Sequence, residues 1–304
     1  MNLNPLRVFL AIVDSGSQRA AARALGLTQP AVTKALQKLE SELDVRLFDR
    51  SVHGANLTEY GQTLLSHARL IDTELRHCVE ELDQIRGIRK GSISIALSHL
   101  PGTVLLPSVL RNFRKKWPDV RLRIAASTYP YLLAGLREGS LDFAIAPAPL
   151  DAWPEDLTRE PLMQTTLSPI VRLGHPLASA RRLSDLADAE WILPTHESAT
   201  AQALYAAADK LHLPRPHCQT TCETLTGMIM LIASSDLIGL VPSEMVASMG
   251  SLGGVVEVPI ADRLEGAELC LVRRRASVPT PAAAALALAF SKAAHELARR
   301  SAGA

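Results

Sequence analysis

Hydrophobic residues in the first 58 positions recur at the spacing of an α-helix, in short runs bounded by capping residues or glycines. Asn4 and Pro5 open the first predicted helix, and Gly16 ends it. Ser17 caps a second helix, which Gly26 ends. A third helix follows at once, so the pattern predicts the adjacent helices and tight turn of a helix-turn-helix.

The third predicted helix is capped by Thr28, carries Pro30 in its first turn and runs to about Leu43. One side of it is apolar and contains Val32, Ala35, Leu36, Leu39 and Leu43. The opposite side is polar, with Gln29 at the tip followed by Thr33, Lys34, Gln37, Lys38 and Ser41. Amide and hydroxyl groups can pair with base edges, so this side is a candidate DNA-reading surface. The alternative is an ordinary amphipathic helix with a solvated polar side.

Charge is distributed unevenly, although the whole chain carries only +1 from 32 basic and 31 acidic residues. Residues 15–39 contain no acid and four basic residues, which are Arg19, Arg23, Lys34 and Lys38. The next ten residues contain four acids, which are Glu40, Glu42, Asp44 and Asp49. A local excess of positive charge suits contact with DNA phosphates, whereas the balanced total argues against binding of polyanions over the whole surface.

A short turn at Gly54 separates two candidate strands, Leu47-Phe48 and Leu57-Thr58. This arrangement predicts a wing beside the helices. Arg50 and His53 would lie on it and could reach the DNA backbone or minor groove.

Thr58 caps a long predicted helix over residues 59–86. Apolar or small residues recur along it in steps of four and three, at Leu64, Ala68, Ile71, Leu75, Cys78, Leu82 and Ile85. A narrow seam of this kind favours a partner helix, so we expect a homodimer. Its two recognition helices would face half-sites about one DNA turn, or a multiple of it, apart. The alternative is a long helix that packs on its own domain.

Strands and helices alternate from Gly87 and Gly91 to the end of the chain. The first series has strands at 92–97, 120–126 and 141–146 and helices at 103–116 and 130–138. The second has strands near 164–172, 190–193, 217–221 and 237–241, helices near 199–211, 223–233 and 243–249, a strand near 268–273 and an Ala-rich helix from about 281. The pattern predicts an α/β domain with two sublobes and parallel strands covered by helices.

Ligands of open α/β sheets bind at the carboxyl ends of strands, near helix N-termini. The candidate ligand-binding residues at such positions are Ser98, His99, Thr128, Tyr129, Pro147, His196, Thr200 and Glu223. Ser98 is the first choice, because it follows the first strand and precedes a helix start, where an anionic group is stabilised.

Each of these candidates also has a structural alternative. Ser98 could be a turn or capping residue and Tyr129 a lobe-interface residue. Glu223 could be a helix cap, and His196 could be solvated in its loop. No cluster of arginines lines these loops, so we expect a small organic ligand with at most one carboxylate or sulfonate group.

The sequence favours neither an enzyme nor a metal protein. It contains no G-x-S-x-G, no G-x-x-x-x-G-K-[ST], no H-E-x-x-H and no G-x-G-x-x-G after a strand. The four cysteines form no C-x-x-C pair, so we expect no disulfide framework, metal or cofactor. Apolar stretches are too short for a signal peptide or membrane span, so we expect a cytoplasmic protein without membrane contact. A small-molecule binding module whose N-terminal helices serve only for association is the remaining alternative.

Residues at fixed spacing through the N-terminal segment carry a resemblance to a known family. They are Phe9, Ala11, Gly16-Ser17, Ala20-Ala21, Leu25, Thr28 to Thr33, Leu39-Glu40, Leu47-Phe48, Arg50, Leu57-Thr58 and Gly61. This set resembles the DNA-binding signature of LysR-type transcriptional regulators, and the likeness extends by pattern over the whole chain.

The resemblance implies that Gln29, Thr33 and Lys34 contact bases and phosphates, with Arg50 at the wing. Together with the charge pattern, the candidate DNA contacts are Arg19, Thr28, Gln29, Pro30, Thr33, Lys34, Lys38, Arg50 and His53. The family often has Ser at position 33 and Arg at position 34. Lys34 keeps the positive charge but lacks the two-pronged guanidinium group, which changes what it can recognise.

The resemblance also implies the architecture and the partners. We expect a winged helix-turn-helix over residues 1–58, a linker and dimerisation helix over 59–86 and an effector-binding domain over 87–304. That domain would resemble type 2 periplasmic binding proteins, with lobe I at about 92–162 and 268–304 and lobe II at about 163–267. The implied assembly is a homodimer or dimer of dimers on promoter DNA. An effector between the lobes would modulate DNA binding, with RNA polymerase as a further partner.

Overall fold

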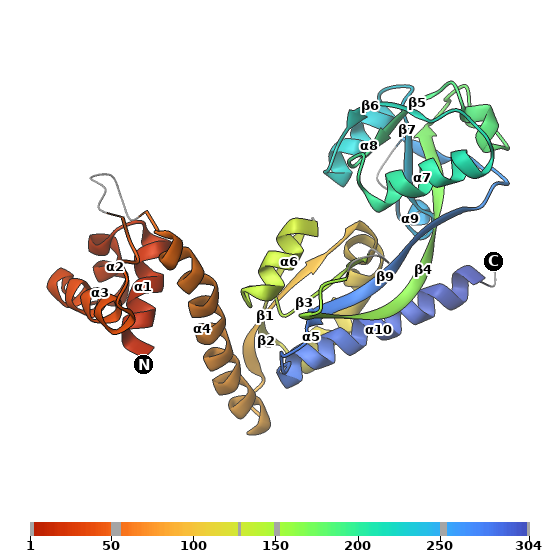
Figure 1. The fold of residues 1–304 in the computed structure, drawn as a ribbon. Helices are drawn as coiled ribbons and strands as arrows, with labels where there is room; N and C mark the ends of the chain where they lie inside the picture. Colours follow the sequence, from red (N-terminus) through yellow and green to blue (C-terminus); the bar gives the residue numbers. More distant parts are fainter. Residues whose placement is uncertain (1–2, 50–55, 127–128, 149–152, 250–253, 303–304) are drawn as a thin grey trace. The chain divides into compact units, whose positions relative to one another are not determined.

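The N-terminal part of the chain is helical (Figure 1). Its helices are α1 (Leu3–Ser15), α2 (Gln18–Leu25), α3 (Gln29–Leu43) and the long α4 (Glu59–Ile85). Three predicted caps are present: the side chains of Ser17, Thr28 and Thr58 each accept a hydrogen bond from a backbone N–H in the first turn. The prediction of Asn4 as a cap is wrong, because α1 begins at Leu3 and Asn4 lies inside it. Gly26 ends α2 in the left-handed conformation, with a φ of 64°, which a residue without a Cβ adopts at little cost.

The structure is a computed structural model that describes residues 3–49, 56–126, 129–148, 153–249 and 254–302. Its residues group into two compact units. The first unit consists of Met1–Ile88 and Pro130–Leu141, and the second consists of Arg89–Tyr129 and Asp142–Ala304.

The helices of the first unit enclose a hydrophobic core. Its buried members are Leu6, Val8, Phe9, Ile12, Ala21, Ala22, Val32, Leu36, Leu39, Leu47 and Ala68. The ring centroids of Phe9 and Phe48 lie 5.5 Å apart, which joins α1 to the segment after α3. Phe48 pairs with Leu57 in one antiparallel bridge, so the two candidate wing strands meet at this pair.

The second unit contains a nine-stranded sheet in the order β2-β1-β3-β9-β4-β7-β5-β6, with β8 beside β4. The strands are β1 (Lys90–Leu97), β2 (Asp119–Ala126), β3 (Phe143–Pro147), β4 (Leu157–Arg172), β5 (Glu190–Leu193), β6 (His217–Thr221), β7 (Ile238–Pro242), β8 (Val255–Glu257) and β9 (Leu264–Arg274). As predicted, β1 is parallel to β2 and β3, and β5 is parallel to β6 and β7. The long strands β4 and β9 are antiparallel to each other.

Strands β4 and β9 connect two lobes (Figure 1). One lobe contains β1, β2 and β3 with helices α5 (Leu106–Lys116) and α10 (Pro281–Ala302), and the other contains β5, β6 and β7 with α7 (Ala199–Lys210), α8 (Leu225–Ala233) and α9 (Ser243–Met249). A π-helical turn at Pro101–Leu105 precedes α5, and a 3₁₀ turn at Leu183–Leu186 precedes β5. The β4–β9 register shifts between Pro161 and Met163 and again between Gln164 and Thr166. These irregularities bend the pair where it passes between the lobes.

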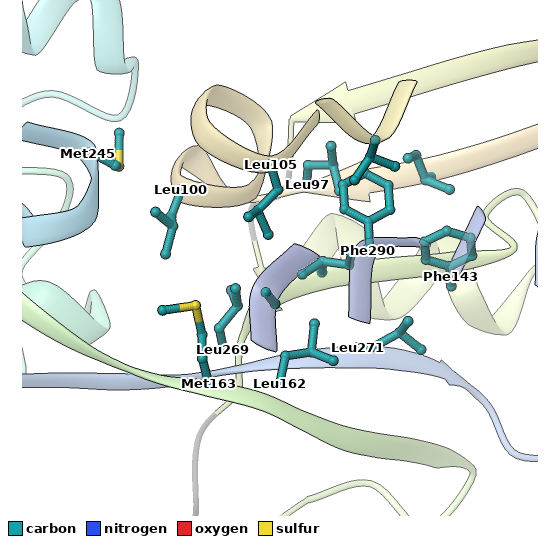
Figure 2. Packing of buried hydrophobic residues seen from close by; sticks show 14 of the residues in the cluster. Leu97, Leu100, Leu105, Phe143, Leu162, Met163, Met245, Leu269, Leu271 and Phe290 are labelled. Atoms are coloured by element: carbon teal, nitrogen blue, oxygen red, sulfur yellow. The ribbon is translucent and has the colours of Figure 1, made fainter. Parts of the chain in front are cut away.

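Buried hydrophobic residues hold both lobes together (Figure 2). The labelled members of the larger cluster are Leu97, Leu100, Leu105, Phe143, Leu162, Met163, Met245, Leu269, Leu271 and Phe290. Phe143 of β3 meets Phe290 of α10 edge to face, with centroids 6.4 Å apart. A second cluster, around the fully buried Trp191, forms the core of the lobe that contains β5.

Helix α6 (Tyr129–Arg137), from Pro130 onward, and the turn after it belong to the first unit, although β2 and β3 on either side belong to the second. Arg69 of α4 forms an ion pair with Glu138, at 3.3 Å between Nη1 and Oε2. Gly139 has a φ of 72° and lies against Leu70 and Thr73, so closely that a Cβ there would lie 3.1 Å from the Leu70 side chain. The segment after α6 is therefore fitted to the surface of α4.

Most predicted strands and helices occur within a few residues of their expected positions. The largest differences are β4 and β9, which extend well beyond the predicted 164–172 and 268–273. The added half of β4 contains Thr158, Arg159, Glu160 and Pro161, and only Leu157 among its first four residues is buried. A half-exposed strand with a proline lacks the alternation by which strands are recognised in a sequence.

Candidate DNA-binding surface and effector-binding residues

Helix α3 presents one buried and one exposed side, as its sequence predicts. Val32, Leu36 and Leu39 are buried in the core of the first unit, whereas Leu43 at the end of the apolar side is 37% exposed. Besides Leu43, the exposed residues of the helix are Gln29, Pro30, Ala31, Lys34, Gln37, Lys38, Ser41 and Glu42, and Thr28 just before the helix is also exposed. The polar side is thus free to meet a ligand as large as a DNA duplex.

Thr33 differs from its neighbours because its hydroxyl is engaged within the protein. It lies 2.8 Å from Oε1 of Gln18, the first residue of α2, and 3.1 Å from the backbone carbonyl oxygen of Gln29. Nothing in the spacing of residues along the chain indicates a role for Gln18. Only the three-dimensional crossing of α2 and α3 brings a residue fifteen positions away onto the polar side of the recognition helix.

Positive charge lies around this surface. Arg19 and Lys34 are exposed, and Lys38 is exposed with its Nζ 3.8 Å from Oε1 of Glu42. An exposed pair one helical turn apart contributes little stability, so Lys38 remains able to turn toward a phosphate. The predicted wing contacts Arg50 and His53 lie outside the described residues.

Glu40 is a buried carboxylate at the end of α3, and its role was not evident from the sequence. Its Oε1 accepts a 2.8 Å hydrogen bond from the backbone N–H of Leu47, and its Oε2 lies 3.5 Å from the guanidinium of Arg46. The hydroxyl of Thr58 donates to the carbonyl of Arg46 at 2.7 Å. These bonds tie the end of the recognition helix to the segment that leads to the wing and to the start of α4.

The heptad seam of α4 has two different environments. Ala68 is fully buried in the core of the first unit, and Leu64 and Ile71 pack against that core. Further along the seam Leu75 is half-buried, whereas Cys78, Leu82 and Ile85 are exposed. Leu82 is 50% and Ile85 is 70% exposed, and Val79 beside them is 60% exposed. The first half of the seam thus serves the chain's own core, while the second half offers an apolar surface.

The effector candidates of the first lobe follow neighbouring strands. The backbone N–H of Ser98, after β1, donates to the carbonyl of Ile145 in β3 at 2.9 Å, two residues before Pro147. Burial lowers the pKa of His99 from its ordinary value, because desolvation disfavours the charged imidazolium. Tyr129 is the first residue of α6, and Thr128 lies outside the described residues.

The candidates of the second lobe follow β5 and β6. The backbone N–H of Cys222 donates to the carbonyl of Leu193 at 2.9 Å, which brings these two strand ends together. His196 is exposed, and its Nδ1 lies 3.1 Å from the hydroxyl of Tyr205. Thr200 is half-buried near the start of α7, while Glu223 is exposed just before Thr224, the N-cap of α8. The parallel strands therefore gather the candidates into one group on each lobe.

A further polar cluster lies where α9 begins beside β4. The Ser243 Oγ is 3.1 Å from the hydroxyl of Thr166 and 2.8 Å from that of Ser168. The neighbouring Glu244 has one carboxylate oxygen, Oε2, that is buried without a hydrogen-bond partner in the described part of the chain. Desolvation raises the pKa of Glu244, against the smaller opposing effect of backbone N–H groups. Sequence reasoning missed this group, because its members come from separate elements.

Family models match both parts of this architecture. The model described as "Bacterial regulatory helix-turn-helix protein, lysR family" matches residues 3–62, and the model described as "LysR substrate binding domain" matches residues 86–294. The chain is 26% identical over 267 residues to the HTH-type transcriptional regulator TdcA of Escherichia coli, covering 88% of this chain and 85% of that protein. It is 30% identical over 306 residues to the SDS degradation transcriptional activation protein of a Pseudomonas strain, covering 94% of each.

Solved structures share the fold over nearly the full length. Full-length CbnR in complex with its target DNA matches with a TM-score of 0.70 and 21% identity, covering 96% of this chain and 100% of that one. A full-length OxyR variant from Pseudomonas aeruginosa matches with a TM-score of 0.72 and 20% identity, covering 98% and 97%. Both structures share the N-terminal helix-turn-helix and the two-lobed domain.

The fold and these matches define a transcriptional regulator, in which a helix-turn-helix binds DNA and a two-lobed domain binds a small-molecule effector. The chain belongs to the LysR family of transcriptional regulators, whose members are not enzymes. Within the described residues, no helix is long and apolar enough to cross a membrane, and no group of three or more His, Cys, Asp or Glu could hold a metal ion.

Proposed function

We propose that this regulator reads promoter DNA with the exposed side of α3 and is controlled by a small organic effector held between its lobes. Residues 1–58 would form the DNA-binding domain, residues 59–86 the linker helix and residues 87–304 the effector-binding domain. The observation that carries the proposal is the two-sided character of α3, with Val32, Leu36 and Leu39 in the core and a polar row facing outward.

The individual DNA contacts follow from side-chain chemistry. Gln29 is exposed at the helix tip and carries the amide that pairs with two edge atoms of adenine. Lys34, Lys38 and Arg19 are exposed and would meet phosphates, and the N-terminus of α3 favours an anion. Arg50 and His53 would add contacts from the wing.

A homodimer would bring two such surfaces to one DNA site. The second half of the α4 seam supports pairing, since Leu75 is half-buried and Cys78, Leu82 and Ile85 are exposed. Pairing of dimers would give a tetramer. A change in the relative placement of the two helix-turn-helix domains would alter half-site contacts and the access of RNA polymerase. Couplings of about 1–3 kcal/mol are typical of such control.

The effector would bind between the groups at Ser98 and His99 on one lobe and at His196 and Thr200 on the other. The carboxyl ends of parallel strands in both lobes support this placement. The burial that keeps His99 neutral and the absence of an arginine cluster among the candidates favour an effector with at most one negative charge. Pro147, Tyr129, Thr128 and Glu223 would complete its surroundings.

Fluorescence anisotropy with the protein's own promoter fragment and a random duplex tests the DNA-reading role. Gln29→Ala should weaken binding to the promoter by about 10-fold or more while changing the affinity for random DNA little, since a bidentate base contact is worth roughly 1–3 kcal/mol. Lys34→Ala should weaken binding to both duplexes equally. It should also reduce the slope of log affinity against log salt by about one, because one fewer counterion is released. Gln219→Ala, at an exposed glutamine of β6, is the matched control. Equal losses on both duplexes for Gln29→Ala would contradict the base contact.

A further inference from the structure

The contact between Gln18 and Thr33 links the two helices of the helix-turn-helix on their outer side. Gln18 is the first residue of α2, Thr33 is in the second turn of α3, and both are half-buried. Their hydrogen bond, at 2.8 Å, is the shortest made by either side chain among the described residues. Its position beside exposed Gln29 and Lys34 places it at the surface assigned to DNA.

The number of hydroxyl and amide protons in this pair determines which hydrogen bonds it can donate to a ligand. A threonine hydroxyl has one proton, and Gln18 Oε1 and the carbonyl of Gln29 are both placed to accept it. Thr33 therefore has no proton left for DNA. Gln18, with its oxygen held by Thr33, keeps two N–H donors on Nε2, and no described residue of the protein accepts from them.

The location of Gln18 indicates which part of DNA would accept these protons. In a helix-turn-helix the second helix enters the major groove, while the helix before it crosses the sugar-phosphate backbone. Gln18 stands at the N-terminus of that preceding helix, directly after its cap Ser17 and next to exposed Arg19. An uncharged amide donor beside a basic side chain suits a phosphate oxygen.

We propose that Gln18 is a DNA-backbone contact, held in place by Thr33, whose Nε2 donates a hydrogen bond to a phosphate oxygen. Thr33 then acts as a positioning residue for Gln18 and meets the groove only as an acceptor or through its methyl group. This inference rests on the proposed DNA-reading role of α3, and it adds a residue from outside the recognition helix.

Two substitutions of Gln18 distinguish its hydrogen bond with Thr33, which holds the side chain in place, from the proposed donation by its Nε2 to DNA. Gln18→Glu keeps an oxygen that can accept from Thr33, but it replaces the donors with negative charge. Gln18→Ala removes both. We expect Gln18→Ala to lower affinity about 2- to 10-fold, the effect of one hydrogen bond, and Gln18→Glu to lower it more. Because a phosphate contact carries no sequence information, the loss should be equal on promoter and random duplexes.

The salt dependence gives a second readout. A neutral amide displaces no counterion, so Gln18→Ala should leave the slope of log affinity against log salt unchanged, whereas Lys34→Ala should reduce it by about one. Thr33→Val removes the hydroxyl that holds Gln18 in place. In a double-mutant cycle, the loss of DNA-binding free energy caused by Gln18→Ala should therefore be at least halved in the Thr33→Val background. Thr33→Ser, which retains the hydroxyl, should keep the full loss.

The outcomes distinguish this inference from the proposed function. If the wild-type protein binds no DNA, the proposed function fails. If the wild type binds and Gln29→Ala loses selectivity, but Gln18→Ala and Gln18→Glu bind like the Gln219→Ala control, only the role of Gln18 is overturned. A loss confined to the promoter duplex would also overturn it, because that result assigns Gln18 to a base edge. Helical circular dichroism equal to that of the wild type verifies that each variant is folded.

Discussion

The carboxylate of Glu40 accepts a 2.8 Å hydrogen bond from the backbone N–H of Leu47, and both residues are buried. The carbonyl of Leu47 in turn accepts from the N–H of Thr58 at 3.0 Å. One backbone unit is thereby fixed on both sides, to the end of α3 and to the start of α4. The orientation of the recognition helix relative to the linker helix depends on this junction.

Replacement of Glu40 by Ala should destabilise the N-terminal unit by about 1–3 kcal/mol, because it leaves the buried N–H of Leu47 without an acceptor. Glu40→Gln is the matched control, since its amide oxygen can still accept that bond. Hydrogen exchange of the full-length protein measures the effect at amides of α1 to α3. If Glu40→Ala and Glu40→Gln accelerated exchange equally relative to the wild type, loss of the charge, and not of the hydrogen bond to Leu47, would account for the effect. Exchange at the wild-type rate in Glu40→Ala would contradict the prediction.

Leu82→Asp should shift the protein from dimer to monomer in sedimentation equilibrium. An unpaired carboxylate in the seam of two helices costs at least about 3 kcal/mol, which is roughly a 100-fold weaker association. The fold of the monomer should be unaffected, since Leu82 is 50% exposed within its own chain. Leu288→Asp, at a leucine of α10 that is 56% exposed, is the control and should remain dimeric. A dimeric Leu82→Asp variant would exclude this half of α4 from the interface.

The thiol of Cys270 should resist alkylation in the folded protein at pH 8. Burial, followed by the nearby carboxylate of Glu268, raises the pKa of Cys270 to about 12. Only about one thiol in ten thousand would then be the reactive thiolate at that pH. Mass spectrometry after iodoacetamide treatment should find Cys270 modified only when urea is present. Modification in the folded protein as fast as at half-buried Cys222 would contradict this.

Protonation of His99 should make the effector-binding domain less stable in mild acid. Burial holds its pKa below the ordinary 6.5, so the unfolded chain binds the proton more readily than the folded chain does. The contribution of neutral His99 is complete above about pH 6.5 and falls as the pH decreases from there toward the lowered folded value.

Urea unfolding of the wild type and of His99→Gln at pH 7.5, 6.5 and 5.5 measures this contribution. The midpoint should fall less with decreasing pH in His99→Gln than in the wild type. His217→Gln, at an exposed histidine of β6, should behave like the wild type. If the urea midpoint fell equally with decreasing pH in the wild type and in His99→Gln, His99 would not be the source of the pH dependence.

The apolar side of α3 illustrates what the sequence could predict. Val32, Leu36 and Leu39 are one helical turn apart, and this local spacing is sufficient to place them in a core. Glu40 follows them directly and is also buried, because Leu47 supplies its partner across a turn. No periodicity encodes that partner. Burial of a charge depends on contacts that form only in three dimensions.

Ala68 shows a different limit of sequence reasoning. Its place in the heptad of α4 predicted a contact with a second chain, but the core of its own unit buries it completely. Heptad spacing reports that one side of a helix is apolar, and it does not report which surface covers that side. The exposed Leu82 and Ile85 lie on the same seam and leave the prediction of a partner helix open to test. The sequence does not indicate the contact of Gln18 for a related reason, since its partner Thr33 is on another helix.

Dimethyl sulfate protection on the protein's own promoter fragment tests the placement of α3 most directly. The reagent methylates N7 of guanine in the major groove and N3 of adenine in the minor groove, so it reports which groove is occupied. If α3 enters the major groove, guanine N7 should be protected in two half-sites whose centres lie about 10–10.5 base pairs, or a multiple, apart, and protection should be weaker with Gln29→Ala. Full protein occupancy of the fragment with every guanine N7 still reactive would contradict it.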